Sequence, residues 1–186
     1  SQTTVLSLDE AGRVRTWDLR ALGPIRQLSL GRSGEYIRQI IFQSQPGQLL
    51  ATSKHAFARF DPQSGDPPSL TSPDALDMCI LPGSAARAFC PDRQTVVLES
   101  LATRETLWRA PVDFTEGIFA SPDGRLLAIS EAQGNIAILR ISDGKRLGTL
   151  AGDPIGNLRP QFSPDGSRLL CASITGIISL HDTNSC

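Results

Sequence analysis

The sequence predicts an all-β chain made of repeated four-stranded antiparallel units. The first observation is a repeat, because Ser121-Pro122-Asp123-Gly124 returns as Ser163-Pro164-Asp165-Gly166, 42 residues later. The second is that the segments between the turns are short apolar runs bounded by Gly, Pro, Asn or Asp, without helical spacing. Asp-Gly between two such runs favours a hairpin, since Gly adopts positive φ without a Cβ penalty.

Earlier turns extend the repeat toward the N-terminus. Pro46-Gly47 and Pro82-Gly83 precede apolar runs in the way that Gly124 and Gly166 do. The third unit allows another alignment, with Cys90-Pro91-Asp92-Arg93 as its turn, but this leaves too few residues for four strands before the next turn. With Pro82-Gly83 as the turn, one strand of each unit ends in an equivalent pair. These pairs are Trp17-Asp18, Phe60-Asp61, Leu98-Glu99, Leu139-Arg140 and His181-Asp182.

The spacing of about 40–45 residues, the Trp17-Asp18 pair and the two Ser-Pro-Asp-Gly turns resemble the WD-repeat (WD40-type) β-propellers. The resemblance covers essentially the whole chain and implies blades of four strands, a to d. A Gly-His pair that is common before strand a in this family is missing. Ser7, Asp9 and Trp17 retain the other members of its hydrogen-bonded set in the first blade. This departure suits a diverged, bacterial member.

We expect one propeller segment, residues 1–186, with five whole or partial blades. Their approximate limits are 1–30, 37–70, 77–109, 117–150 and 158–186. The first blade supplies strands b, c and d, and the fifth stops after strand c. Exposed strand edges pair readily with other chains, and blades rely on neighbours to cover their faces. We therefore expect a larger ring of seven or eight blades, completed by upstream sequence, a companion chain or a second copy.

Composition excludes several classes of partner. The formal net charge of −1, with both signs spread along the chain, argues against a nucleic-acid or anionic-membrane partner. No apolar run is long enough for a transmembrane helix, and the N-terminus lacks a signal-peptide pattern. We expect a reducing, cytoplasmic location, which the cysteines do not contradict. Ser1 stands in place of an initiator Met, and we expect the native chain to begin upstream. Cys79 and Cys171 lie in apolar runs and are interpreted as small core residues.

Catalytic and cofactor motifs are absent from the sequence, and we predict neither enzyme activity, nor a cofactor, nor a metal site. The histidines, His55 and His181, are about three blades apart, and His181 falls at a structural strand position. Neither a nucleophile elbow nor a phosphate-binding glycine loop is present. One alternative is a ligand-binding or hydrolytic propeller with a site at the central channel, which would need acids from several blades.

The expected function is binding. In the family, the d–a and b–c loops share one face, which is the usual partner site. Here the d–a loops are 31–36, 110–116 and 151–157, and the b–c loops include 9–10, 54–55 and 131–133. Because Arg and aromatic residues are enriched in binding hot spots, the candidate contacts are Arg32, Tyr36, Phe114 and Arg159. The competing interpretation is that Tyr36 and Phe114 pack between blades and that the arginines are ordinary surface.

The sequence thus predicts a non-catalytic protein-interaction scaffold or sensor module. The resemblance implies that it belongs to a larger signalling or effector protein. A second alternative is a structural assembly subunit whose open edges pair with another chain. In each of these interpretations a protein partner is expected.

Overall fold

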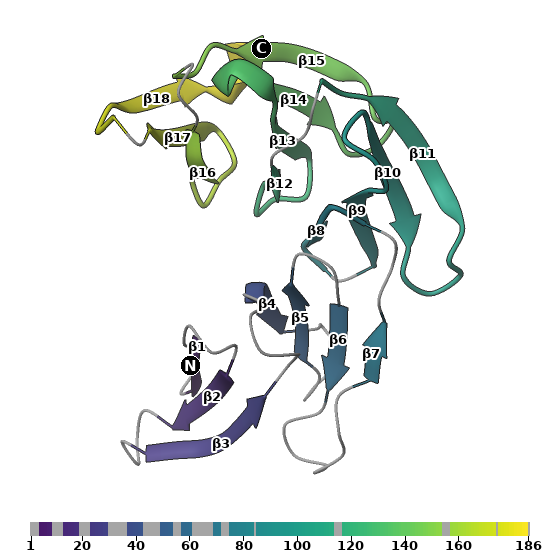
Figure 1. Cartoon of the computed structure of the whole chain (residues 1–186), viewed down its shortest axis with the longest axis vertical. Coiled ribbons are helices and arrows are strands. Elements are labelled where there is room, and N and C mark those ends of the chain that lie inside the picture. The colour runs from purple at the N-terminus through teal and green to yellow at the C-terminus, as the bar shows by residue number, and fades with distance from the viewer. Residues whose placement is uncertain are drawn as a thin grey trace. The chain divides into compact units, whose positions relative to one another are not determined.

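In a computed structural model, the chain forms five antiparallel β-sheets, two in residues Ser1–Pro73 and three in Asp74–Cys186 (Figure 1). The structure describes the backbone of seven strands between residues 4 and 71, and then residues 75–83, 85–113, 117–153, 157–173 and 175–185. In these parts the regular structure is β-strand apart from two short 3-10 turns. The predicted fold class, all-β with antiparallel sheets, is confirmed.

The N-terminal unit contains a three-stranded sheet, β1-β2-β3, and a four-stranded sheet, β4-β5-β6-β7. The first sheet consists of β1 (Thr4–Leu8), β2 (Arg13–Asp18) and β3 (Gly23–Ser29). The second consists of β4 (Ile37–Phe42), β5 (Leu49–Ser53), β6 (Phe57–Phe60) and β7 (Ser69–Thr71). Trp17 is paired with Val5 in the first sheet, and Phe60 with Leu49 in the second.

The C-terminal unit contains three sheets that follow each other along the chain. The third sheet consists of β8 (Asp77–Ile80), β9 (Ala86–Cys90), β10 (Thr95–Ser100) and β11 (Thr106–Pro111). The fourth consists of β12 (Gly117–Ala120), β13 (Leu126–Ser130), β14 (Ile136–Arg140) and β15 (Arg146–Leu150). The fifth has only β16 (Asn157–Phe162), β17 (Arg168–Ser173) and β18 (Ile178–Asp182). The 3-10 turns are η1 (Ala132–Gly134) and η2 (Thr183–Ser185).

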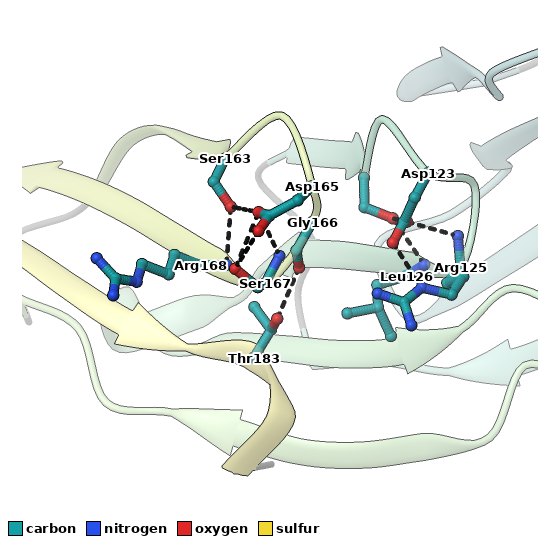
Figure 2. A network of polar contacts seen from close by, with 10 residues as sticks. Asp123, Arg125, Leu126, Ser163, Asp165, Gly166, Ser167, Arg168 and Thr183 are labelled. Atoms are coloured by element: carbon teal, nitrogen blue, oxygen red, sulfur yellow. Dashed lines mark hydrogen bonds and ion pairs between the residues drawn. The ribbon is translucent and has the colours of Figure 1, made fainter.

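The Ser-Pro-Asp-Gly segments form the turns between strands a and b, and side chains hold each turn closed (Figure 2). In the fourth sheet, the Ser121 hydroxyl accepts a bond from Leu126 N at 2.9 Å and donates to Asp123 Oδ1 at 2.6 Å. Arg125 N donates to the same carboxylate oxygen at 3.0 Å. Partial burial raises the pKa of Asp123. The bonds from Ser121 and Arg125 outweigh this effect, so the net pKa is lowered.

The equivalent turn of the fifth sheet repeats this arrangement (Figure 2). Ser163 Oγ accepts a bond from Arg168 N at 2.9 Å and donates to Asp165 Oδ1 at 2.6 Å. The Ser163 hydroxyl, followed by the amide and hydroxyl of Ser167, stabilises the charged carboxylate and lowers the pKa of Asp165 to about 2. The repeat in the sequence is therefore a repeat of one hydrogen-bonded turn.

Two apolar clusters fill the spaces on either side of the fourth sheet. The first joins the third and fourth sheets and includes Ala88 and Leu98 on one side and Leu127 and Leu139 on the other. The second joins the fourth and fifth sheets through two sets of buried residues. These are Ala128, Ile136 and Ile138 of the fourth sheet with Phe162, Leu169 and Cys171 of the fifth. Side chains alternate between the two faces of a strand, so β13 and β14 contribute to both clusters.

The third sheet corrects the alignment predicted from the sequence by one residue. Leu81 N donates to Ala86 O, as Ser121 N donates to Leu126 O, so Pro82-Gly83 does form the a–b turn. Pro82 therefore aligns with Pro122, and Gly83 takes the place of Asp123, not of Gly124. The Trp-Asp position accordingly falls on Glu99-Ser100, where the prediction had Leu98-Glu99. A bulge supports this, because it lies at Leu98/Glu99 in the third sheet and at Ile138/Leu139 in the fourth.

This register places an ion pair where the first, second and fourth sheets have two apolar residues. Arg87 is paired with Glu99 across β9 and β10, at the position that holds Leu127 and Leu139 in the fourth sheet. Arg87 Nη2 lies 2.9 Å from Glu99 Oε1, with side chains 5% and 13% exposed. The Arg87 guanidinium also lies 4.7 Å from the centre of the Phe89 ring. Burial lowers the pKa of Arg87, and the charge of Glu99 opposes this shift.

Cys79, Cys90 and Cys171 are buried free thiols within these clusters. Burial raises the pKa of Cys79 and raises that of Cys171 to about 11. The interpretation of Cys79 and Cys171 as core residues is thus confirmed. Such thiols are poor nucleophiles because the reactive thiolate is suppressed.

Candidate interaction face

The loops between sheets and the loops between strands b and c lie at one end of the strands in the C-terminal unit, as expected for antiparallel strands. Glu131 follows β13, and its side chain is only 3% exposed. Its carboxylate accepts a bond from Asp113 N, in the preceding d–a loop, at 2.9 Å. Asp113 O in turn accepts a bond from Ala132 N at 3.2 Å. Of the two loops that were predicted to share a face, the described residue Asp113 therefore contacts Glu131 and Ala132.

Arg146 fixes Glu131 from the other side. Its Nη1 and Nη2 donate to Glu131 Oε1 and Oε2 at 2.9 and 2.7 Å, so the pair is bidentate. Arg146 Nη2 also donates to Thr149 Oγ1 at 2.8 Å. A bidentate arginine–carboxylate pair restricts orientation as well as supplying energy. Glu131 is therefore a positioning residue for the loop end of the fourth sheet, not an accessible acid.

The next pair of loops is held in a related way. Asp153, in the loop after β15, accepts a bond from Thr175 Oγ1, which in turn lies 2.5 Å from Ser173 Oγ. Gly134 and Asp153 approach so closely that a Cβ on Gly134 would lie 1.7 Å from Asp153 O. Gly134 also has a φ of +75°, so glycine meets both requirements there.

Gln133 lies between the residues that make these contacts, and it is exposed. It lies within η1 with φ +61° and ψ +20°, a left-handed conformation that is uncommon for residues other than glycine. Residues held in such conformations cluster at functional sites. We call Asp113, Glu131, Gln133, Asp153 and Thr175 the loop end of the C-terminal unit.

The four contact residues predicted from the sequence are not tested by the structure. Arg32, Tyr36 and Phe114 lie outside the described residues. The backbone of Arg159 lies in β16, and its side chain is not described. Glu131 and Gln133 lie in a predicted b–c loop and Asp153 in a predicted d–a loop, but none of them was predicted as a contact residue, and Thr175 was not predicted at all. The sequence did contain an indication of these residues, because a polar residue lies near the start of each of these loops.

Side chains that could bind a metal ion are not grouped in the described parts of the chain. No group of three or more His, Cys, Asp or Glu residues there could hold a metal ion. His181 lies in β18, with Nε2 3.0 Å from Ser179 Oγ, which fits the strand position predicted for it. His55 lies outside the described residues. Among the described elements, no helix is long and apolar enough to cross a membrane.

One face of the fifth sheet exposes apolar side chains. Leu170, Ile178 and Leu180 are 42%, 71% and 59% exposed. They stand 42 residues after Ala128, Ile136 and Ile138, which are fully buried against the fifth sheet. Contiguous exposed apolar residues of this kind mark interaction sites. The uncovered face is thus the counterpart of a face that is covered in the fourth sheet.

Comparison with known proteins connects this fold to a family, although no family model matches the chain. A WD repeat-containing protein of Synechocystis is 32% identical over 96 residues, covering 50% of this chain. The chain spans only 27% of the length of that relative.

Solved structures agree over nearly the whole chain. Kluyveromyces lactis Hsv2 matches with a TM-score of 0.70 and 10% identity, covering 97% of this chain and 59% of that one. A chain of the mitotic checkpoint complex matches with a TM-score of 0.76 and 16% identity, covering 98% and 61%. These structural neighbours are WD40 propellers. The repeated turns, the antiparallel sheets and these similarities together show a β-propeller fold, and in it the chain is similar to WD-repeat proteins.

Proposed function

We propose that the chain is a non-catalytic interaction scaffold or sensor module that binds a protein partner through its loop end. The observation that carries this proposal is the buried Glu131, which joins Asp113 of the loop before the fourth sheet to Arg146 in β15 of that sheet. These contacts hold the exposed Gln133 in a fixed, uncommon conformation. A rigid scaffold that positions loops is the usual basis of binding in repeat folds.

The relatives support this general role. WD-repeat propellers are generally non-catalytic, and one structural neighbour is a component of the mitotic checkpoint complex. We propose that Arg32, Tyr36, Phe114 and Arg159 contribute contacts to the partner. A role within a larger signalling or effector protein is consistent with the small share of the Synechocystis relative that the chain spans. A cytoplasmic location suits the buried free thiols, since disulfides are rare in that compartment.

Site-specific photo-crosslinking in cells tests the loop end. A photoreactive phenylalanine replaces Gln133, and a matched variant carries it at Ala102, which is exposed in the c–d turn at the opposite end of the strands. We expect a discrete crosslinked protein from position 133 and none from position 102. Equal crosslinking at both positions, or none at either, would contradict binding at the loop end.

We also propose that the five sheets belong to one propeller segment whose ring of seven or eight blades is completed by another blade. The exposed Leu170, Ile178 and Leu180 support this, because their counterparts in the fourth sheet are covered by the next sheet. The covering face would present an aromatic residue and small or branched apolar residues, as Phe162, Leu169 and Cys171 do. A further stretch of sequence, a companion chain or a second copy could supply it.

Native mass spectrometry of the 186-residue chain tests ring completion. We expect a second copy or a second polypeptide to accompany the chain, and Leu180→Glu to abolish this association. Leu107→Glu is the matched control, because Leu107 is 56% exposed in β11 and Leu180 is 59% exposed in β18. A wild-type chain that remains monomeric and unfolds cooperatively would refute completion in trans.

A further inference from the structure

Trp108 fills a slot between the third and fourth sheets. It lies in β11, is half-buried and packs against the apolar cluster that joins these sheets. Its indole Nε1 donates to the carbonyl of Ile141, in the c–d turn of the fourth sheet, at 2.7 Å. A Cβ on Gly144 would lie 2.7 Å from the indole ring. The turn of one sheet is therefore shaped to receive a tryptophan from the previous sheet.

The next junction has glycine at the position of this tryptophan. Gly148 of β15 is paired with Ile138, directly before the bulge at Ile138/Leu139. Trp108 is paired with Leu98, directly before the bulge at Leu98/Glu99. The register therefore makes Gly148 the structural equivalent of Trp108, without the side chain.

The first residues of the receiving turn are present at this junction, whereas the position of Gly144 falls on Cys186, outside the described residues. Thr183 N donates to Ser167 O at 2.9 Å, as Ile141 N donates to Arg125 O at 2.8 Å. Thr183 thus takes the place of Ile141, whose carbonyl accepts the indole N–H in the junction before it. Thr183 is itself fixed, because its hydroxyl donates to Gly166 O at 2.7 Å (Figure 2).

A groove of about 490 Å³ lies at this second junction, and it is lined by Thr183 and by Leu147, the residue before Gly148 in the sequence. Its apolar part includes Leu126 and Leu147, which pack against the cluster joining the fourth and fifth sheets. Its charged lining residues are Arg125 and Arg140, whose side chains are 65% and 43% exposed, and among the described residues no carboxylate lines it. Each guanidinium uses Nε to bind the aspartate of its own turn, which fixes its orientation.

We propose that this groove binds a tryptophan side chain of a partner protein, carried on a segment rich in Asp and Glu. The indole would take the place that Trp108 occupies one junction earlier and would donate its N–H to the Thr183 carbonyl. The flanking carboxylates would pair with Arg125 and Arg140. Tryptophan and arginine are the residues most enriched in binding hot spots, and charge-assisted bonds to arginine are the stronger ones.

This inference specifies the chemistry of a partner and so rests on the proposed function, but it uses a different surface. The groove is formed at the a–b and c–d turns, whereas the loop end is formed by the b–c and d–a loops at the other end of the strands. Variants at Gln133 and variants at Gly148 therefore test the two proposals separately.

Fluorescence anisotropy with a defined probe tests the groove. The probe is a fluorescein-labelled pentapeptide, Glu-Asp-Trp-Asp-Glu, and its control has Ala in place of Trp. With the full 186-residue chain, we expect saturable binding of the probe and at least tenfold weaker binding of the control. Binding should weaken with added salt because the flanking carboxylates are paired with surface arginines.

Two variants make the test decisive. Gly148→Trp places the indole of the chain itself in the slot, so we expect at least a tenfold loss of probe binding without loss of thermal stability. Arg140→Glu should weaken binding of the probe severalfold and leave the folded structure unchanged. This variant tests the proposal even if Gly148→Trp fails to fold. Gln133→Ala, at the loop end, should bind like the wild type. Equal binding of the two peptides, no saturable binding, or full binding by Gly148→Trp would overturn the proposal.

Discussion

The fourth and fifth sheets follow the same sequence plan, but they differ in what covers them. Both have an equivalent turn between strands a and b, and their strands carry apolar residues at many of the same positions, 42 residues apart. The fourth sheet is buried on both faces, by the third sheet on one side and by the fifth on the other. The fifth sheet uses one face against the fourth and exposes Ile178 and Leu180 on the other.

This difference shows that exposure depends on neighbouring sheets more than on the sequence of a sheet. Ile136 and Ile178 are the same residue type on equivalent strands, and one is fully buried while the other is 71% exposed. A repeat fold distributes its core over the junctions between units. Equivalent substitutions in the two sheets should therefore have unequal effects.

The largest expected effect separates Ile138 from Leu180. Ile138→Asp buries an unpaired charge at a fully enclosed position, and we expect it to remove about 4–5 kcal/mol or more of the free energy of unfolding. Leu180→Asp should change that free energy by about 0.5 kcal/mol or less in the chain alone. Urea unfolding followed by circular dichroism measures both. A large loss for Leu180→Asp would mean that this face is covered in solution.

The buried ion pair gives the next largest effect and compares the third sheet with the fourth. Glu99→Ala leaves the guanidinium of Arg87 buried without its carboxylate, and we expect a loss of about 3–5 kcal/mol in the free energy of unfolding. The double variant Arg87→Leu/Glu99→Leu reproduces the Leu127 and Leu139 pair of the fourth sheet. It should recover most of this loss in the same urea experiment. No recovery would show that the third sheet cannot accept an apolar pair.

Gly134 and Gly176 provide a smaller contrast at equivalent positions of the two sheets. Both have positive φ, but a Cβ on Gly134 would lie 1.7 Å from Asp153 O, whereas nothing lies within 4 Å of one on Gly176. Gly176→Ala should destabilise by about 1–2 kcal/mol, the usual penalty for this conformation. Gly134→Ala should cost more because the loop must also move. Differential scanning calorimetry of the two variants would rank them, and equal losses would contradict the close approach.

The smallest expected effect concerns the acid sensitivity of the a–b turns. Asp165 has a pKa of about 2, below the ordinary value of 3.8, so its folded state favours the charged form. Its contribution to stability is complete above about pH 4 and disappears as the pH falls toward 2. We expect Asp165→Asn to be slightly less stable than the wild type at pH 5, with the difference vanishing near pH 2. A difference that persists at pH 2 would point to a cause other than ionisation.

The sequence predicted the strands well because the turn signals are local. Ser121, Asp123 and Gly124 close a turn through bonds within six residues, and strands lie on both sides of it, as the turn signal predicts. The third repeat was misaligned because Pro82-Gly83 lacks the Ser and Asp that fix the register elsewhere. The bond from Leu81 to Ala86 and the bulge at Leu98/Glu99 establish the observed register.

The candidate sites were harder to predict because they depend on pairs that are far apart in the sequence. Trp108 meets Ile141 across 33 residues, and Asp153 meets Thr175 across 22. An alignment of the repeats could identify Gly148 as the equivalent of Trp108. It would not show that Trp108 fills a slot between two sheets. The significance of the glycine follows only from that contact. Arg32, Tyr36, Phe114 and Arg159 stay predictions.

The three buried thiols allow the two junctions of the C-terminal unit to be observed separately. Cys79 and Cys90 belong to the cluster between the third and fourth sheets, and Cys171 belongs to the cluster between the fourth and fifth. A thiol reagent can reach each one only when its own junction opens, because local openings differ in free energy across a structure. The rate at which each cysteine is labelled therefore reports how often its junction opens. The order of labelling would show which of the two junctions opens first.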